Sequence, residues 1–169
     1  MSILDEMKEV ASWFNEYLFS TLDGEPKELY DASYHLMKSG GKRMRPFMVL
    51  KSYELFNNEV ERALPAAAAL EFLHNFTLAH DDIMDNDSFR HGVPTIHVKY
   101  NTSTAILAGD VLFAAAFQSV SKRFRELKFD SERAIRIVEL LVDASIKICE
   151  GQAQDLIMHY QKKVFYYYG

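Results

Sequence analysis

Cysteine is nearly absent from this chain, in which Cys149 is the single example among 169 residues. One thiol cannot form an internal disulfide, and such scarcity indicates a reducing compartment, so we interpret Cys149 as an ordinary helix residue. Excess basic charge is also lacking, because 24 acidic side chains outnumber 19 basic ones and the formal net charge is −5. With no basic stripe along the chain, the sequence predicts no nucleic-acid partner.

Targeting and membrane signals are missing as well. The N-terminus Met-Ser-Ile-Leu-Asp-Glu lacks the basic start and apolar run of a signal peptide. No apolar run approaches the roughly 20 residues that cross a bilayer. No Ser/His/Asp or Cys/His arrangement indicates nucleophilic catalysis. We therefore expect a cytoplasmic protein without a transmembrane segment and without a nucleophilic side chain.

Alternating apolar and polar residues, the pattern of half-buried strands, are absent too, and no internal repeat is found. Apolar residues recur instead at helical spacing, and 49% hydrophobic residues suffice for a core. We predict an all-α fold in which Pro65 lies in the first turn of its helix and Asn86–Asn101 forms an irregular loop. The predicted helices are Leu4–Thr21, Glu25–Lys38, Pro46–Asn57, Glu61–Asp85, Ser103–Leu127 and Ser131–Tyr160.

The most informative segment that is present runs from His80 to Gly92. At about 100° per residue, Asp81 and Asp85 share one helix face about one turn apart, with Asp82 beside them. Carboxylates this close repel each other unless a cation lies between them, and Mg²⁺ is the cation that completes its shell with phosphate oxygens. Arg90 follows and would donate to the same phosphate. The segment predicts a magnesium–diphosphate site, although an isolated Asp-Asp-x-x-Asp run is more often a solvated helix end.

A second phosphate-binding pattern, Ser-Gly-Gly-Lys-Arg-Met-Arg-Pro, occupies residues 39–46. The two glycines end one helix, and the proline suits the first turn of the next. Lys42, Arg43 and Arg45 therefore lie at a helix N-terminus, where unpaired N–H groups already favour an anion. The alternative interpretation is a flexible basic loop in solvent.

Together these motifs resemble those of the short-chain trans-prenyl diphosphate synthases, the farnesyl and geranylgeranyl diphosphate synthases. Gly-Gly-Lys-Arg-x-Arg-Pro and His-Asp-Asp-Ile-Met-Asp carry the likeness, and Leu107–Asp110 and Glu150–Asp155 match in family order. The likeness runs from about Tyr30 to Tyr160. It implies that residues 1–169 are the N-terminal half of the all-α isoprenoid synthase bundle. The implied activity is a Mg²⁺-dependent condensation of isopentenyl diphosphate with an allylic diphosphate.

The resemblance also assigns roles to residues. Asp81 and Asp85 match the metal ligands, Asp82 supports them, and Arg90 matches the arginine that binds the allylic diphosphate. These four form the predicted catalytic set. His74 matches a position that contacts isopentenyl diphosphate, and its alternative role is a satisfied histidine within a helix. The predicted substrate-binding residues are Lys42, Arg45, His74, Arg90, His91 and Gln152.

The chain departs from the family pattern in two ways. His91 stands where a second arginine is usual, and an imidazole cannot form the guanidinium fork, so we expect weaker or pH-dependent binding of isopentenyl diphosphate. The likeness also stops after Tyr160, so the second Asp-rich motif is absent. Gln152 and Asp155 resemble the polar patch on a later helix that faces the metal site.

Product length is predicted to depend on the residues just before the acidic motif. Phe76 is an aromatic residue five positions before Asp81, and Thr77 is a small residue four positions before it. This arrangement resembles the archaeal type of geranylgeranyl diphosphate synthase, so we favour geranylgeranyl diphosphate as the product and Phe76 as the floor of an apolar tunnel.

Three function classes remain open: half of a prenyl diphosphate synthase, a non-catalytic regulatory subunit derived from one, and a terpene cyclase-type lyase. The intact acidic motif counts against the second class, and the isopentenyl diphosphate site counts against the third. We predict a split synthase, in which a separate polypeptide supplies the second Asp-rich motif in a dimer of heterodimers. Helices near 103–151 would mediate self-association, and the aromatic tail Val164–Tyr168 would dock on the partner. The alternative is a truncated gene product.

Overall fold

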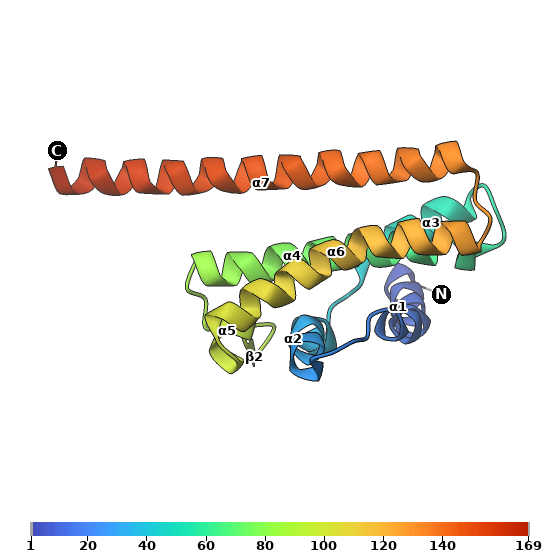
Figure 1. Cartoon of the computed structure of the whole chain (residues 1–169), viewed down its shortest axis with the longest axis horizontal. Coiled ribbons are helices and arrows are strands. Elements are labelled where there is room, and N and C mark those ends of the chain that lie inside the picture. Colours follow the sequence, from blue (N-terminus) through green and yellow to red (C-terminus); the bar gives the residue numbers. More distant parts are fainter. Residues whose placement is uncertain (1, 169) are drawn as a thin grey trace. The chain divides into compact units, whose positions relative to one another are not determined.

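The computed structural model describes the backbone of residues 2–168 and the side chains of residues 2–159 (Figure 1). The chain divides into two compact units, Met1–Phe129 and Asp130–Gly169. The second unit consists of one helix, α7 (Ser131–Tyr168), which continues past Tyr160, where the sequence pattern predicts its end. The predicted docking tail Val164–Tyr168 lies outside the described side chains.

The first unit is built almost wholly of helices, which confirms the all-α prediction. Pro65 lies in the first turn of its helix, as predicted, and a short 3-10 turn precedes that helix. A two-stranded hairpin and one short helix interrupt the segment between residues 86 and 101. In chain order the elements are α1 (Ile3–Ser20), α2 (Lys27–Lys38), α3 (Met44–Glu54), η1 (Val60–Ala63), α4 (Leu64–Met84), β1 (Phe89–Arg90), β2 (Val93–Pro94), α5 (Ile96–Lys99) and α6 (Thr102–Glu126).

Helices α4 and α6 lie side by side and form the most extensive helix–helix interface of the first unit (Figure 1). Small buried side chains line both helices, among them Ala68 on α4 and Ala108 on α6. Gly109 permits a particularly close approach, because a Cβ there would lie 2.4 Å from the His80 Nε2 atom. Packing of this kind holds α4, which carries the acidic motif, in a fixed register against α6.

The same helix α6 is long and apolar enough to cross a membrane by length and composition. The sequence analysis expected no such run. Because 44% of its most apolar window is buried inside the structure, α6 has the character of a core helix.

The segment 86–101 is more ordered than the sequence analysis predicted. Its strands pair antiparallel, Arg90 opposite Val93, across a turn made by His91 and Gly92. Both turn residues have positive φ, 51° and 80°, as a two-residue hairpin turn requires. Thr95 is fully buried, and its hydroxyl donates to the Asp87 carbonyl at 2.8 Å. The prediction of an irregular loop was therefore wrong for this part of the chain.

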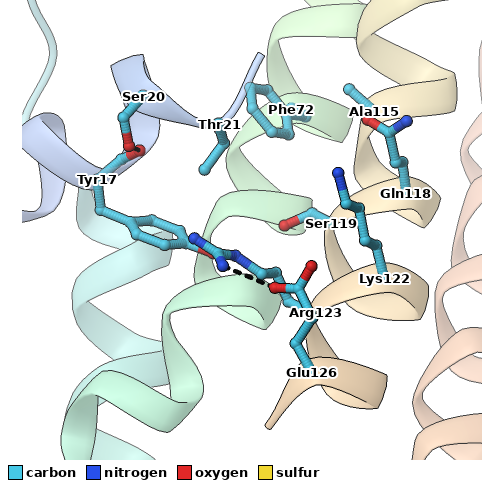
Figure 2. Close-up of a pocket in the computed structure, with 10 residues that line it drawn as sticks. All are labelled: Tyr17, Ser20, Thr21, Phe72, Ala115, Gln118, Ser119, Lys122, Arg123 and Glu126. Atoms are coloured by element: carbon cyan, nitrogen blue, oxygen red, sulfur yellow. Dashed lines mark hydrogen bonds and ion pairs between the residues drawn. The ribbon is translucent and has the colours of Figure 1, made fainter.

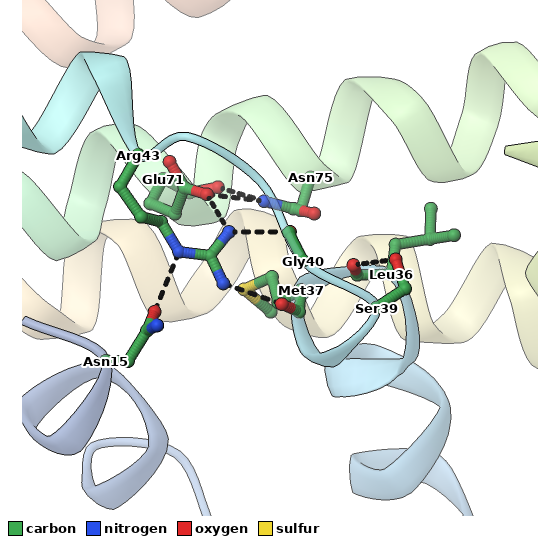
Figure 3. A network of polar contacts seen from close by, with 8 residues as sticks. All are labelled: Asn15, Leu36, Met37, Ser39, Gly40, Arg43, Glu71 and Asn75. Carbon is green, nitrogen blue, oxygen red and sulfur yellow. Dashed lines mark hydrogen bonds and ion pairs between the residues drawn. The ribbon is translucent and has the colours of Figure 1, made fainter. Parts of the chain in front are cut away.

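Arg43 turns inward (Figure 3). Its basic neighbours Lys42 and Arg45 are exposed. Its backbone is left-handed, with φ 48°, immediately before the first residue of α3. Arg43 Nη1 donates to Glu71 Oε1 on α4 at 2.9 Å, and the two side chains are only 4% and 6% exposed. Nε donates to the Asn15 side chain at 2.8 Å and Nη2 to the Met37 carbonyl at 2.6 Å. The sequence analysis grouped Arg43 with the anion-facing cations, which is wrong because its donors serve the core.

We expect Arg43→Ala to lower the free energy of unfolding by about 3–5 kcal/mol, because it leaves the Glu71 carboxylate buried without its cation. Lys42→Ala removes the neighbouring exposed cation and should change the free energy of unfolding by less than about 0.5 kcal/mol. Urea unfolding followed by circular dichroism measures both. Equal effects of the two substitutions would contradict the structural role of Arg43.

Candidate functional site

Asp81 lies in the last turn of α4 and Asp85 directly follows its last residue, Met84. Asp81 is partly buried and Asp85, the C-terminal cap, is exposed. Burial, and next the negative charge of Asp85, raise the pKa of Asp81, while Arg90 opposes the shift. The C-terminus of a helix also carries partial negative charge, and no basic residue lies in this last turn. The arrangement is therefore electrostatically unfavourable until a cation approaches.

The donor set suits a metal that takes only part of its shell from protein. Among the described residues, no group of three or more His, Cys, Asp or Glu side chains is arranged to hold a metal ion. Asp81 and Asp85, spaced by four residues on one helix face, provide two carboxylates. Mg²⁺ typically binds one or two carboxylates and completes its shell with water and substrate phosphates. The residues present fit such an ion.

Asp82 is buried and forms an ion pair with Arg90. It is 1% exposed, and its Oδ1 accepts a hydrogen bond from Arg90 Nε at 2.5 Å. Its second oxygen, Oδ2, is buried without a hydrogen-bond partner among the described residues. Burial raises the pKa of Asp82, and the hydrogen bond from Arg90 counteracts that rise. Asp82 thus positions the arginine, and the predicted support of the metal ligands Asp81 and Asp85 stays a prediction.

Arg90 is held at the start of the hairpin, at the end of α4. Its Nη2 also donates to Asp87 at 3.3 Å, while Nη1 has no protein partner in the described part of the chain. The hairpin itself is fixed to α2, because His35 Nε2 donates to the Pro94 carbonyl at 2.7 Å. The turn places His91, the residue that replaces a usual arginine, in a left-handed conformation with φ 51°.

His74 lies two turns before Asp81 on α4 and is partly buried. Its pKa is lowered from the usual 6.5 to about 4, first by burial and then by the nearby side chains of Arg45, His91, Arg90 and Arg43, in that order. The basic loop and the hairpin therefore direct their charges toward the same part of α4. This convergence is the main electrostatic feature of the site, and it favours an anion.

Lys42, in the basic loop, and Arg45, in α3, are both exposed, and their binding of substrate stays a prediction. Arg45 lies in the first turn of α3, whose N-terminus has no side-chain cap, so its backbone N–H groups add to the positive field. Arg45 and the hairpin residues Arg90 and His91 are among the main causes of the lowered pKa of His74.

Phe76, the predicted tunnel floor, packs between α4 and α6. Its ring lies edge-on to His80, with 4.8 Å between centroids, and 5.0 Å from the ring of Phe113 on α6. Phe113 in turn lies 5.1 Å from Phe117. The sequence analysis missed Phe113 because nothing in the spacing of α6 indicates that it meets Phe76. Thr77 donates its hydroxyl to the His74 carbonyl at 2.8 Å.

Gln152 and Asp155 lie on α7, in the second unit. Their orientation toward the acidic motif stays a prediction.

A separate cavity of about 220 Å³ lies among α1, α4 and α6 (Figure 2). Arg123, which pairs with Glu126 at 2.7 Å, lines it together with Tyr17 and Lys122. It contains none of the predicted site residues. The remaining lining residues are Ser20, Thr21, Phe72, Ala115, Gln118 and Ser119.

Comparison with known proteins places these observations in a family. The family described as polyprenyl synthetase matches residues 26–167, so the likeness extends past Tyr160, beyond the limit that the sequence analysis set. A short chain isoprenyl diphosphate synthase of Methanocaldococcus jannaschii is 46% identical over 149 residues, 88% of this chain and 44% of that protein. A geranylgeranyl diphosphate synthase of Sulfolobus acidocaldarius is 47% identical over 157 residues, 92% of this chain and 47% of that protein.

Comparison with solved structures also gives members of this family. A geranylgeranyl pyrophosphate synthetase from Pyrococcus horikoshii superposes with a TM-score of 0.85 at 41% identity, covering 93% of this chain and 47% of that one. The corresponding protein of Geoglobus acetivorans gives a TM-score of 0.84 at 42% identity, with 90% and 49% covered. This chain therefore spans about half the length of the relatives it matches.

We expect His74 to stay neutral down to about pH 4. Because its folded pKa lies below the unfolded value near 6.5, the unfolded state binds the proton more tightly, and stability falls as pH drops from 6.5 toward 4. His74→Gln should reduce that loss by about 1–2 kcal/mol, after allowance for partial exposure. Urea unfolding at several pH values measures the free energy of unfolding of each variant. His159→Gln, at an exposed position on α7, is the control. An equal pH dependence in wild type and His74→Gln would contradict the assignment.

Proposed function

Because the chain belongs to the polyprenyl synthetase family, we propose that it forms the diphosphate-binding half of a short-chain prenyl diphosphate synthase. The proposal is supported by the nearby side chains of Arg45, Arg90 and His91, which help to lower the pKa of His74, and by the Asp81–Asp85 pair at the end of the same helix. We infer two anion-binding regions along α4, one formed with cations from α3 and the hairpin and one suited to a metal. Condensation of two diphosphates needs such a pair of regions.

Each residue then has a distinct task. Asp81 and Asp85 would hold Mg²⁺, which supplies Lewis-acid stabilisation of the departing diphosphate when bound. Arg90, held by Asp82, donates to the allylic diphosphate as its C–O bond breaks. Lys42, Arg45 and neutral His74 bind isopentenyl diphosphate, whose double bond attacks the allylic carbon once its C–O bond has broken. The new chain then loses a proton to the released diphosphate. No nucleophilic side chain is required.

The relatives named above include geranylgeranyl diphosphate synthases, which supports geranylgeranyl diphosphate as the product. The cationic region around His74 has no use in a terpene cyclase-type lyase, and an intact Asp81–Asp85 pair has none in a regulatory subunit. Both alternatives are therefore weaker than the synthase. We keep the reducing cytoplasm as the expected compartment, on the basis of the single cysteine.

The second Asp-rich motif of the family does not occur within residues 1–169. We propose that this motif completes the metal site from the half of the family's length that these residues do not span. Mixing the 169-residue chain with a polypeptide that carries the second half decides whether that half acts as a separate chain. A stable complex that restores condensation supports the split synthase, and full activity of the 169-residue chain alone overturns it.

Self-association through α6 and α7 also stays a proposal. Large apolar side chains are exposed on both helices, including Ile106 and Leu107 on α6 and Leu140 and Ile146 on α7. Exposed apolar groups of this kind often mark an interface. Sedimentation of the 169-residue chain, with and without the second half, measures its oligomeric state.

In the complete enzyme, Asp81→Ala and Asp85→Ala should each abolish Mg²⁺-dependent turnover while the helical content stays unchanged. Each change removes a carboxylate that positions the metal, and with it the leaving-group stabilisation that is usually the largest catalytic contribution, so we expect a loss of at least about 10²-fold. Asp23→Ala, in the exposed loop after α1, is the matched control. Near-normal turnover in either site variant would refute the metal assignment.

Phe76→Ser should lengthen the product, because removal of the ring opens space beside Phe113 and His80. Phe56→Ser is a suitable control, since that ring is 90% exposed. Chromatography of products from the complete enzyme measures chain length. An unchanged length distribution in Phe76→Ser would exclude Phe76 as the floor.

A further inference from the structure

The ion pair between Arg43 and Glu71 joins the two parts of the chain that hold the proposed isopentenyl diphosphate site. Arg43 lies in the basic loop, between Lys42 and Arg45. Glu71 lies on α4, three residues before His74, so it is one helical turn from the third proposed ligand. The pair is therefore a direct connection between the loop cations and the helix that carries both His74 and the acidic motif (Figure 3).

The donors of Arg43 are already occupied. Besides its bonds to Glu71, Asn15 and Met37, Nη1 donates to the Gly40 carbonyl at 3.2 Å. Glu71 Oε1 also accepts from Asn75 Nδ2 at 3.4 Å, and the same Nδ2 donates to the Glu71 carbonyl at 2.9 Å. A guanidinium bound to this many protein oxygens in the interior cannot turn to a phosphate without breaking the network.

The loop needs this restraint because its backbone is otherwise permissive. Gly40 and Gly41 both have φ near 130°, a region that side chains disfavour and glycine visits freely. Arg43 itself is left-handed, which costs free energy unless the surroundings fix it. The hydrogen bonds to Gly40 and Met37 anchor both sides of the loop to α4 through Glu71. Without them, Lys42 and Arg45 would sample many positions relative to His74.

We propose that Arg43 and Glu71 are positioning residues for isopentenyl diphosphate: together they hold Lys42 and Arg45 at a fixed distance from His74 and do not touch the substrate. This inference rests on the proposed function. Misplacement of a group by about 1 Å can lower the reaction rate on the order of 10²-fold. Loss of this restraint should therefore have a measurable effect on the use of one substrate. The allylic diphosphate would bind about two helical turns further along α4, near Asp81 and Arg90, and Arg90 is held by Asp82 and Asp87 and not by the Arg43–Glu71 pair.

The test compares two conservative variants in the complete enzyme, in which both diphosphate sites are present. Arg43→Lys keeps the charge but loses the planar fork that reaches Asn15 and Met37, and Glu71→Gln keeps the shape but removes the negative charge. Calorimetry measures the binding affinity for isopentenyl diphosphate in the absence of metal. It also measures, in the presence of Mg²⁺, the affinity for an allylic thiolodiphosphate, an analogue that does not ionise readily. Circular dichroism at the titration temperature checks folding. Asn15→Ala, which removes one hydrogen bond and leaves the ion pair, provides a milder variant if either of the others unfolds.

We expect Arg43→Lys and Glu71→Gln each to weaken isopentenyl diphosphate binding by roughly 10-fold or more and to change allylic binding by less than about twofold. Asn15→Ala should weaken only the binding of isopentenyl diphosphate, and by a smaller factor. Equal weakening of both ligands would indicate a merely structural pair and overturn the inference. Tighter isopentenyl diphosphate binding in Glu71→Gln would also overturn it, because it would show that Arg43, once released, is itself a ligand.

Lys42→Ala separates failure of this inference from failure of the proposed function. If Lys42→Ala weakens isopentenyl diphosphate binding while Arg43→Lys and Glu71→Gln leave it unchanged, the positioning role is wrong and the site assignment stands. If wild type does not bind isopentenyl diphosphate, or Lys42→Ala has no effect on its binding, the proposed site itself is wrong.

Discussion

Alanines on both sides of the α4–α6 interface let the two helices pack closely, and the His80 ring fills the space that Gly109 leaves open. Every residue of the proposed site on α4 depends on this packing. The helix itself sets the spacing of Asp81, Asp82 and His74, and their position relative to α6 is fixed because α4 cannot shift against α6 without a steric clash. A helix fixed in this way can carry charges that are unfavourable by themselves, since the apolar interface on its other side stabilises it.

Those unfavourable charges are arranged by sign along α4. Carboxylates lie at the negative end of the helix dipole, where Asp81 and Asp85 also repel each other. Nearer the middle of the helix, His74 is kept neutral by burial and by the cations around it. A metal ion would stabilise the first region and an anion the second. One diphosphate bound with metal and one bound without it would relieve both, which agrees with the proposed function.

The sequence predicted the parts of the fold that follow from helical periodicity and failed where tertiary contacts decide. The pattern of α4 gave its ends to within a few residues and placed Asp81 and Asp85 on one face, because both follow from the helical repeat alone. The hairpin at 89–94 was missed, although His91-Gly92 is a composition that tolerates positive φ. Phe113 was missed as the neighbour of Phe76 because periodicity on α6 does not specify the register against α4.

Arg43 shows why a motif of like charges cannot be divided by inspection. Lys42, Arg43 and Arg45 are equally basic, and the sequence gives no alternation that would bury one of three. What decides is the backbone: φ 48° at Arg43 directs its side chain toward Glu71, a carboxylate on a helix that begins more than twenty residues later. A buried carboxylate at Glu71 is costly without a cation, and an inward arginine is costly without an anion. Each therefore requires the other, and the two exposed cations remain available for substrate because the third has been taken into the core.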